Sequence, residues 1–255
     1  MTPTTVTSRR RHPTAAAVAS DPIQTKGDPV SFLDRIIAAN TPGPFRADPV
    51  TADTALAGGR HPVLPDPQPH TVLGTPITGP WREGQRHIVL GLGCFWGAEK
   101  LFWQLDGVES TAVGYAGGYT ANPTYREVCT GRTGHAEVVD VVYDPERITE
   151  EEILRVAFEN HDPTQGDRQG NDVGAQYRSA VYATTPGQLE TAREVARAYG
   201  EKLRDAGYGD MTTEITMLDD TPAGTVYLAE DEHQQYLDKN PGGYCPVHAT
   251  GVTCG

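Results

Sequence analysis

Long apolar segments and positive charge are both scarce in this sequence. No run approaches the ~20 consecutive apolar residues that a membrane-spanning helix requires. Lysine and arginine number 21 against 34 aspartates and glutamates, which gives a formal net charge of −13. Because nucleic-acid binding depends on cationic contacts with phosphates, this balance argues against a nucleic-acid partner. We expect a soluble acidic protein that binds neither nucleic acid nor a membrane.

Cysteine is also rare, with four in 255 residues. Four widely spaced cysteines without a C-x-x-C pair are too few for the disulfide scaffold of a small secreted domain. The chain has three arginines at 9–11 and then a run of small residues at 15–19. That run is shorter than the apolar region of a signal peptide, which needs about 7–15 residues. We therefore expect a cytoplasmic protein, with an organellar transit peptide as the open alternative.

Aromatic residues are sparse in the first 85 residues, which hold three of them beside 13 of the 20 prolines. Such a segment buries too little apolar surface to offset the entropy of ordering. We predict that residues 1–57 form a flexible, proline-rich extension with one short helix at 31–37. The predicted units after it are an extended arm at 58–85, the α+β domain that would carry the chemistry at 86–239, and a mobile, cysteine-bearing tail at 240–255.

The remaining residues alternate between strand and helix patterns. Two capping boxes, at 149–152 and 185–188, mark the starts of helices. The order βαββαβ with additions is that of the split-βαβ, ferredoxin-like folds, so we predict an α+β protein with a mixed sheet. The predicted strands are 87–92, 108–115, 135–143, 176–183 and 212–218, and the predicted helices are 95–105, 149–160, 185–207 and 228–239.

One cysteine lies where a predicted strand ends and a predicted helix begins. Cys94 follows the apolar run 87–92 and precedes Phe95 and Trp96. The first N–H groups of a helix and the positive end of its dipole favour a thiolate, which is the nucleophilic form of cysteine. The two aromatic residues would wall a pocket for an apolar group. Cys94 is therefore a candidate nucleophile, and the alternative is an inert buried cysteine.

The glycines around Cys94 do not fit a dinucleotide-binding loop. Residues 91–97 have the pattern G-x-G-x-x-x-G rather than G-x-G-x-x-G. No acidic residue follows a second strand about twenty residues later, where it would bind a ribose. We therefore discount a nucleotide site.

The sequence Gly93-Cys-Phe-Trp-Gly97 resembles the signature of the A-type peptide methionine sulfoxide reductases. The similarity extends from about residue 87 to 254, in the family's order and close to its spacing. It implies an α+β fold and the reduction of methionine S-sulfoxide, free or in proteins, back to methionine as a repair of oxidative damage. The other matching blocks are 114–118, 122–129, 134–137, 170–179 and 233–237.

The resemblance implies a role for each residue that matches a family motif. Cys94 would attack the sulfoxide and become a sulfenic acid. Each of the other residues also has an ordinary explanation as a core, turn or capping residue. The implied roles are contact with the substrate methyl group for Phe95 and Trp96, hydrogen bonding to the substrate oxygen for Tyr125 and Tyr177, ordering of the pocket for Asp172, and support of the site for His233.

The resemblance also implies a disulfide relay in the tail. Cys245 and Cys254 align with the family's resolving and recycling cysteines, and the order of their steps stays open. Thioredoxin or another dithiol would then reduce the protein, which we expect to be a monomer without a bound cofactor or metal. Cys129 matches a family cysteine that has no assigned step, and we expect it to be structural.

Glu137 is the candidate general acid, and here the residues themselves supply an argument. Strand alternation places Glu137 on the same face as Val139, Val141 and Tyr143. An ionised carboxylate on an apolar face is costly, so burial should raise its pKa and keep its proton. A protonated Glu137 can donate to a sulfoxide oxygen. The alternative is a glutamate in an ion pair or at a sheet edge.

Two other functions stay open on the residues alone. A thiol peroxidase or disulfide exchanger would also use a reactive cysteine with resolving partners, but it would need neither the apolar pocket nor Glu137. A zinc-binding module could draw on His233, Cys245, His248 and Cys254. Zinc sites prefer tight ligand pairs, which this set lacks.

Overall fold

A mixed six-stranded sheet forms the centre of the molecule, and the computed structural model describes residues 43–244 and 248–255 together with Met1. The core elements are β1 (Arg86–Leu92), α2 (Phe95–Trp103), β2 (Val108–Ala116), β3 (Ala136–Tyr143), α4 (Glu150–Glu159) and β6 (Ser179–Ala183). The inner strand order is β6-β1-β3-β2, with antiparallel neighbours throughout. This is the split-βαβ arrangement, so the predicted ferredoxin-like α+β fold is confirmed.

Two short strands and a long helix extend this core. The helix α5 (Pro186–Asp205) leads to β7 (Glu214–Met217), which pairs in parallel with β6 at one edge and makes the sheet mixed. At the other edge, β8 (Tyr227–Leu228) pairs with β2. Both predicted capping boxes are present, at the starts of α4 and α5. None of the helices in the described part of the chain combines the length and apolar character needed to cross a bilayer.

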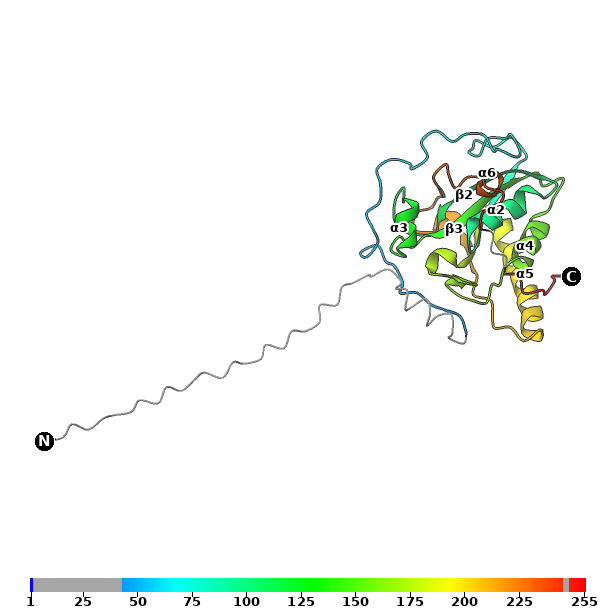
Figure 1. Ribbon diagram of the computed structural model, residues 1–255. Helices are drawn as coiled ribbons and strands as arrows, with labels where there is room; N and C mark the ends of the chain where they lie inside the picture. Colours follow the sequence, from blue (N-terminus) through cyan, green and yellow to red (C-terminus); the bar gives the residue numbers. More distant parts are fainter. Residues whose placement is uncertain (2–42, 245–247) are drawn as a thin grey trace.

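Three helices share the larger core with one face of the sheet (Figure 1). Phe102 of α2, Phe158 of α4 and Leu203 of α5 are almost completely buried there. A smaller cluster around Val138 and Tyr182 lies apart from this core. Successive residues of a strand face opposite sides of the sheet. Val138 therefore lies on one face of β3, whereas its neighbours Glu137 and Val139 lie on the other face.

Residues 43–85 run along the outside of the domain and include no helix or strand (Figure 1). Residues 2–42, with the predicted helix at 31–37, lie outside the described part of the chain. Residues 43–57 belonged to the segment predicted to be flexible, yet they hydrogen-bond to the domain. Phe45 N donates to Gln165 O at 2.9 Å, and Leu56 N donates to Arg132 O at 3.1 Å. The contacting arm therefore includes residues before 58, because its backbone pairs with loops of the domain.

The predicted helix at 228–239 is wrong over most of its length. Only α6 (Tyr236–Lys239) is helical, and Gln235 before it has a left-handed backbone with φ +47°. The side chain of Gln234 is buried and pairs with β2 as a strand would. Its Oε1 accepts from Val113 N at 3.0 Å, and its Nε2 donates to Val113 O at 2.8 Å. These bonds hold the segment against the sheet edge in a non-helical conformation.

Two smaller differences concern segments that carry candidate site residues. The predicted strand at 176–183 begins only at Ser179, because a 3₁₀ turn, η1 (Ala175–Tyr177), precedes it. A short helix that we did not predict, α3 (Tyr125–Cys129), follows Thr124. Thr124 and Glu127 form a capping box, so the T-x-x-E signal for this helix was present in the sequence.

The pairing of Gln234 with β2 can be tested by the substitution Gln234→Leu. Leucine has a similar volume but leaves the buried Val113 N–H without its partner, which typically costs about 1–3 kcal/mol. We expect the free energy of unfolding in urea to fall by that amount. Gln68→Leu, at an exposed position of the arm, is the control and should change the stability by less than about 0.5 kcal/mol. Equal stabilities for the two variants would contradict the pairing.

Candidate active site

Cys94 is the N-cap residue of α2, directly after β1. Gly93 before it has a left-handed φ of +91°, and a Cβ at this position would lie 2.6 Å from Cβ of Gln169. Glycine is therefore required at this turn. The nearby backbone N–H groups of Trp96 and Gly97 lower the pKa of the Cys94 thiol and so favour its thiolate. The structure thus places Cys94 at the predicted junction of strand and helix.

The thiolate preference expected from the helix N-terminus is outweighed in the resting site. Burial, and then the negative charge of Glu137, raise the pKa of the Cys94 thiol well above its ordinary value, against the two N–H groups. Cys94 therefore rests as a thiol. Protonation of Glu137 removes its charge from this balance, and burial and the charge of Asp172 still raise the pKa of Cys94.

Glu137 lies in β3 and is only 1% exposed. The residues on its face, Val139, Val141 and Tyr143, belong to the larger core, as strand alternation predicts. Its Oε2 accepts a hydrogen bond from Phe95 N, the first N–H of α2, at 3.1 Å. Burial, aided by the charge of Asp172 and against the lowering by this bond, raises the pKa of Glu137 to about 8. The carboxyl group is consequently protonated at neutral pH and can act as a proton donor.

Aromatic rings surround the start of α2. The Phe95 ring stacks on Tyr125 with 6.4 Å between centroids, and the Trp96 ring stacks on Tyr236 at 4.0 Å. Trp96 Nε1 donates to Nδ1 of His233 at 3.2 Å. Burial lowers the pKa of His233, so the neutral imidazole is available as this acceptor. His233 thereby fixes the indole.

The predicted substrate-binding residues meet in one small cavity of about 120 Å³. This is well below the roughly 300–1,000 Å³ of a pocket for a drug-sized ligand, and it suits a group at the end of a side chain. Burial, followed by the charge of Glu137, raises the pKa of both Tyr125 and Tyr177. Both hydroxyls therefore keep their protons as hydrogen-bond donors. The cavity is lined by Cys94, Phe95, Trp96, Tyr125, Glu137, Asp172, Tyr177 and Tyr244.

Three residues of the site were missed by the sequence analysis. Tyr244 lines the cavity, with its hydroxyl 3.4 Å from both carboxylate oxygens of Asp172. Tyr236 stacks on Trp96. Glu230 accepts hydrogen bonds from Tyr115 Oη at 2.9 Å and from Tyr125 N at 2.8 Å, which fixes the start of α3. Only the non-helical path of residues 229–235 brings Glu230 there, and the helical pattern gave no sign of it.

The cysteines of the tail are not among the residues that line this cavity. Cys245 lies outside the described residues. Cys254 lies against the helices α4 and α5, where its N–H donates to the Glu159 carboxylate (Figure 1). Burial and the charge of Glu159 raise the pKa of Cys254 to about 11. The hydroxyls of Tyr199 and Tyr208 hold the same segment through Thr250.

The structure around the cavity also bears on Cys129 and on the alternative of a zinc-binding site. Cys129 ends α3, and its side chain hydrogen-bonds to Tyr125. Within residues 43–244 and 248–255, no three potential ligands of the His, Cys, Asp and Glu types are grouped as a metal site would require. Of the residues considered for zinc, His233 lies beside Trp96 whereas Cys254 lies on α4 and α5.

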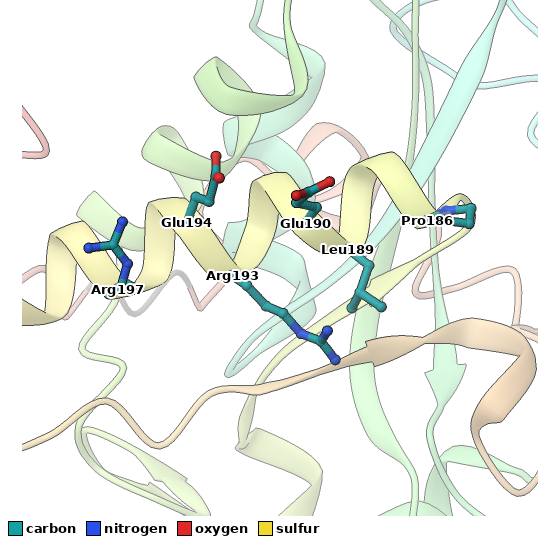
Figure 2. Close-up of a pocket in the computed structure, with 6 residues that line it drawn as sticks. All are labelled: Pro186, Leu189, Glu190, Arg193, Glu194 and Arg197. Atoms are coloured by element: carbon teal, nitrogen blue, oxygen red, sulfur yellow. The ribbon is translucent and has the colours of Figure 1, made fainter.

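A second hollow lies on the outer surface of α5 (Figure 2). Its side chains project from one helix, and they include the exposed, oppositely charged Glu190, Arg193, Glu194 and Arg197. No nucleophile or buried titratable group lines it. Substitutions on this surface are therefore suitable controls for substitutions in the cavity.

Comparisons with known proteins identify one family. The family model described as peptide methionine sulfoxide reductase matches residues 86–253. The chain is similar to the "Peptide methionine sulfoxide reductase MsrA" of Corynebacterium kroppenstedtii, with 69% identity over 80% of this chain and 93% of that relative. It is also similar to the protein of the same name from Corynebacterium efficiens, with 64% identity over 83% of this chain and 97% of that relative.

A solved structure gives the same result in three dimensions. The methionine sulfoxide reductase A of Corynebacterium diphtheriae superimposes with a TM-score of 0.75 and 59% sequence identity. The match covers 82% of this chain and 99% of that one.

The raised pKa of Glu137 predicts how stability depends on pH. Between its ordinary value of 4.5 and about 8, the folded protein binds a proton that the unfolded chain has lost. The free energy of unfolding should therefore fall as pH rises through this window, by at most about 5 kcal/mol. Glu137→Gln removes this contribution, so the stability of wild type relative to this variant should decrease between pH 5 and pH 9.

Urea unfolding at several pH values measures this difference. The exposed substitution Glu146→Gln is the control and should follow the wild-type curve. Parallel curves for wild type and Glu137→Gln would show that Glu137 is ionised in the folded protein.

Proposed function

This chain belongs to the peptide methionine sulfoxide reductase family, and we propose that its 120 Å³ cavity binds methionine S-sulfoxide for attack by Cys94. The protein is an oxidoreductase that returns methionine sulfoxide to methionine. The observation that carries the proposed mechanism is the protonated Glu137 carboxyl in the same cavity as Cys94. A thiol peroxidase would need no apolar wall or buried acid at this point.

The cavity offers a distinct contact for each part of a methyl sulfoxide. The rings of Phe95 and Trp96 would contact the methyl group. The hydroxyls of Tyr125 and Tyr177 would donate hydrogen bonds to the sulfoxide oxygen, whose negative charge grows as the sulfur–oxygen bond weakens. Donors fixed in a buried site stabilise such charge more strongly than water does.

Proton transfer couples Glu137 to Cys94. Glu137 would give its proton to the sulfoxide oxygen, and the carboxylate formed would accept the proton of the Cys94 thiol. The Cys94 sulfur then bonds to the oxygen as the bond between oxygen and the substrate sulfur breaks. Methionine leaves reduced by two electrons, and Cys94 is oxidised by two electrons to sulfenic acid. Atoms and charge balance without any further reactant.

We propose that the tail then reduces the sulfenic acid. The thiol of Cys245 would displace water to form a disulfide with Cys94, and Cys254 would take over the bond to Cys245. Cys254 would have to leave its place on α4 and α5 for this step, with loss of the hydrogen bonds at Thr250. Its thiol, protonated near neutral pH, is a weak nucleophile in the resting position.

Membership of the family supports a proposal for the electron donor. We propose thioredoxin or a similar dithiol as the reductant, proteins that contain oxidised methionine as substrates, and no resident cofactor. We also propose that the protein acts as a cytoplasmic monomer.

Glu137→Gln tests the proton-transfer step. Glutamine keeps the shape of the side chain but carries no transferable proton, so the single-turnover rate should fall by about 10²–10⁴-fold. Rapid quench with a peptide methionine S-sulfoxide measures this rate. Cys94→Ser should be inactive, whereas Glu194→Gln on the surface of α5 should keep the wild-type rate. A wild-type rate for Glu137→Gln would assign the proton to another donor, and consumption of the R epimer or of peroxide alone would refute the function.

Cys254→Ser tests the relay. The first turnover should be unchanged because Cys254 lies away from the cavity, and turnover driven by thioredoxin should be slower. Stopped-flow mixing measures the first turnover. NADPH consumption in an assay coupled through thioredoxin reductase measures the turnover driven by thioredoxin. Undiminished cycling would show that thioredoxin reduces the bond between Cys94 and Cys245 directly.

A further inference from the structure

An outer segment of the chain touches the supports of three cavity residues. Residues 44–59, here called the strap, precede residue 86, where the family match begins. The strap lies on two loops that are far apart in the sequence, at 120–122 and at 165–167, and Leu56 N also donates to Arg132 O. The first loop leads to Tyr125, and the second leads to Asp172 and Tyr177.

The N-terminal part of the strap pairs with the second loop. Phe45 N donates to Gln165 O at 2.9 Å, and Asp167 N donates to Phe45 O at 2.8 Å. Ala47 N adds a bond of 2.9 Å to the Asp167 carboxylate. Asp167 O in turn accepts from Gly174 N at 2.9 Å, which closes the hairpin of β4 (Arg168–Gln169) and β5 (Asp172–Val173). The strap therefore holds the base of the hairpin that carries Asp172 and leads into η1 with Tyr177.

The C-terminal part of the strap pairs with the first loop. Gly59 N donates to Ala121 O at 2.8 Å, and Thr120 Oγ1 donates to Leu56 O at 2.9 Å. Asn122 has a left-handed backbone with φ +44°, which is unfavourable for a residue with a side chain. Its Nδ2 donates to Gly59 O at 3.1 Å. The strap thus supports this conformation three residues before Tyr125.

Each contact has a glycine where the backbones approach. A Cβ on Gly58 would lie 2.0 Å from Ala121 O, and a Cβ on Gly166 would lie 2.1 Å from Phe45 O. Both glycines have left-handed backbones, with φ of +74° and +73°. The strap therefore lies directly on both loops, and any side chain at these positions would push it away.

We propose that the strap is a positioning element of the substrate cavity, which sets Tyr125 through the first loop and Asp172 and Tyr177 through the second. The proposal rests on the proposed function of these residues toward the sulfoxide. A displacement of about 1 Å in a positioning group can reduce a rate by up to about 10²-fold. Cys94 and Glu137 lie on β1, α2 and β3, so their chemistry should be spared.

Two alanine substitutions with matched controls test the proposal. Gly58→Ala and Gly166→Ala add a methyl group that clashes with the strap contact. Gly74→Ala (φ +70°) and Gly84→Ala (φ +87°) impose a similar backbone strain, yet a Cβ at either position meets nothing within 4 Å. We expect the single-turnover efficiency with a peptide methionine S-sulfoxide to fall by roughly 10-fold in the first pair only. The alkylation rate of Cys94 by iodoacetamide should be the same in all four.

A double-mutant cycle separates positioning from general destabilisation. In a Tyr125→Phe background, Gly58→Ala should cost much less than in wild type, because the hydroxyl it displaces is already gone. Gly166→Ala should retain its full effect there. Equal losses in both backgrounds for Gly58→Ala, or activities of the two variants that match their controls, would overturn the proposal.

If Gly58→Ala and Gly166→Ala fail to fold, a third substitution, Asn122→Gly, tests the proposal instead. Asn122→Gly tolerates the left-handed backbone but loses the bond to Gly59 O, and it should show the same dependence on Tyr125 with a smaller loss. An unchanged efficiency for Asn122→Gly would then count against the strap. Failure of wild type itself to reduce the S-sulfoxide would refute the proposed function instead, so the two outcomes are distinguishable.

Discussion

The active site depends on the burial of one carboxyl group against the first turn of one helix. Glu137 enters the core on β3, where its Oε2 accepts the hydrogen bond of Phe95 N. That bond ties the middle of the sheet to the residue after the nucleophile. Burial raises the pKa of the carboxyl to about 8, so the same position that orders the site also keeps the proton that the proposed mechanism requires. The burial that disfavours the ionised Glu137 carboxylate is therefore also what keeps the proton available for transfer in the proposed mechanism.

Further buried acids organise the other side of the cavity. Glu99 of α2 is fully buried and accepts bonds from Gln235 N and Gln235 Nε2, both at 2.8 Å. Burial raises its pKa to about 7. Glu230 holds Tyr115 and the start of α3. These acids bind the segment that contains His233, and His233 and Tyr236 then contact Trp96. The aromatic wall beside Cys94 is consequently fixed by polar groups behind it.

The arm precedes the match to the family model, which begins at residue 86 and includes most of the tail. The strap connects the two loops that lead to the hydroxyl donors and to Asp172, whereas the C-terminal residues lie on α4 and α5. Tyr244 reaches the cavity just before the residues that the structure leaves undescribed. In the proposed mechanism, substrate contacts and redox recycling thus depend on different ends of the chain.

Local patterns in the sequence were sufficient for the βαββαβ order, both capping boxes and the burial of Glu137, because periodicity and capping involve residues close in sequence. The junction at Cys94 was predictable for the same reason. Three features were not predictable: the path of residues 229–235, the role of Glu230 and the position of the strap on the domain. Each depends on hydrogen bonds to residues more than 60 positions away. The thiol state of Cys94 was also decided by tertiary structure. The helix N-terminus favours the thiolate, but the burial of the Cys94 sulfur exceeds that local effect.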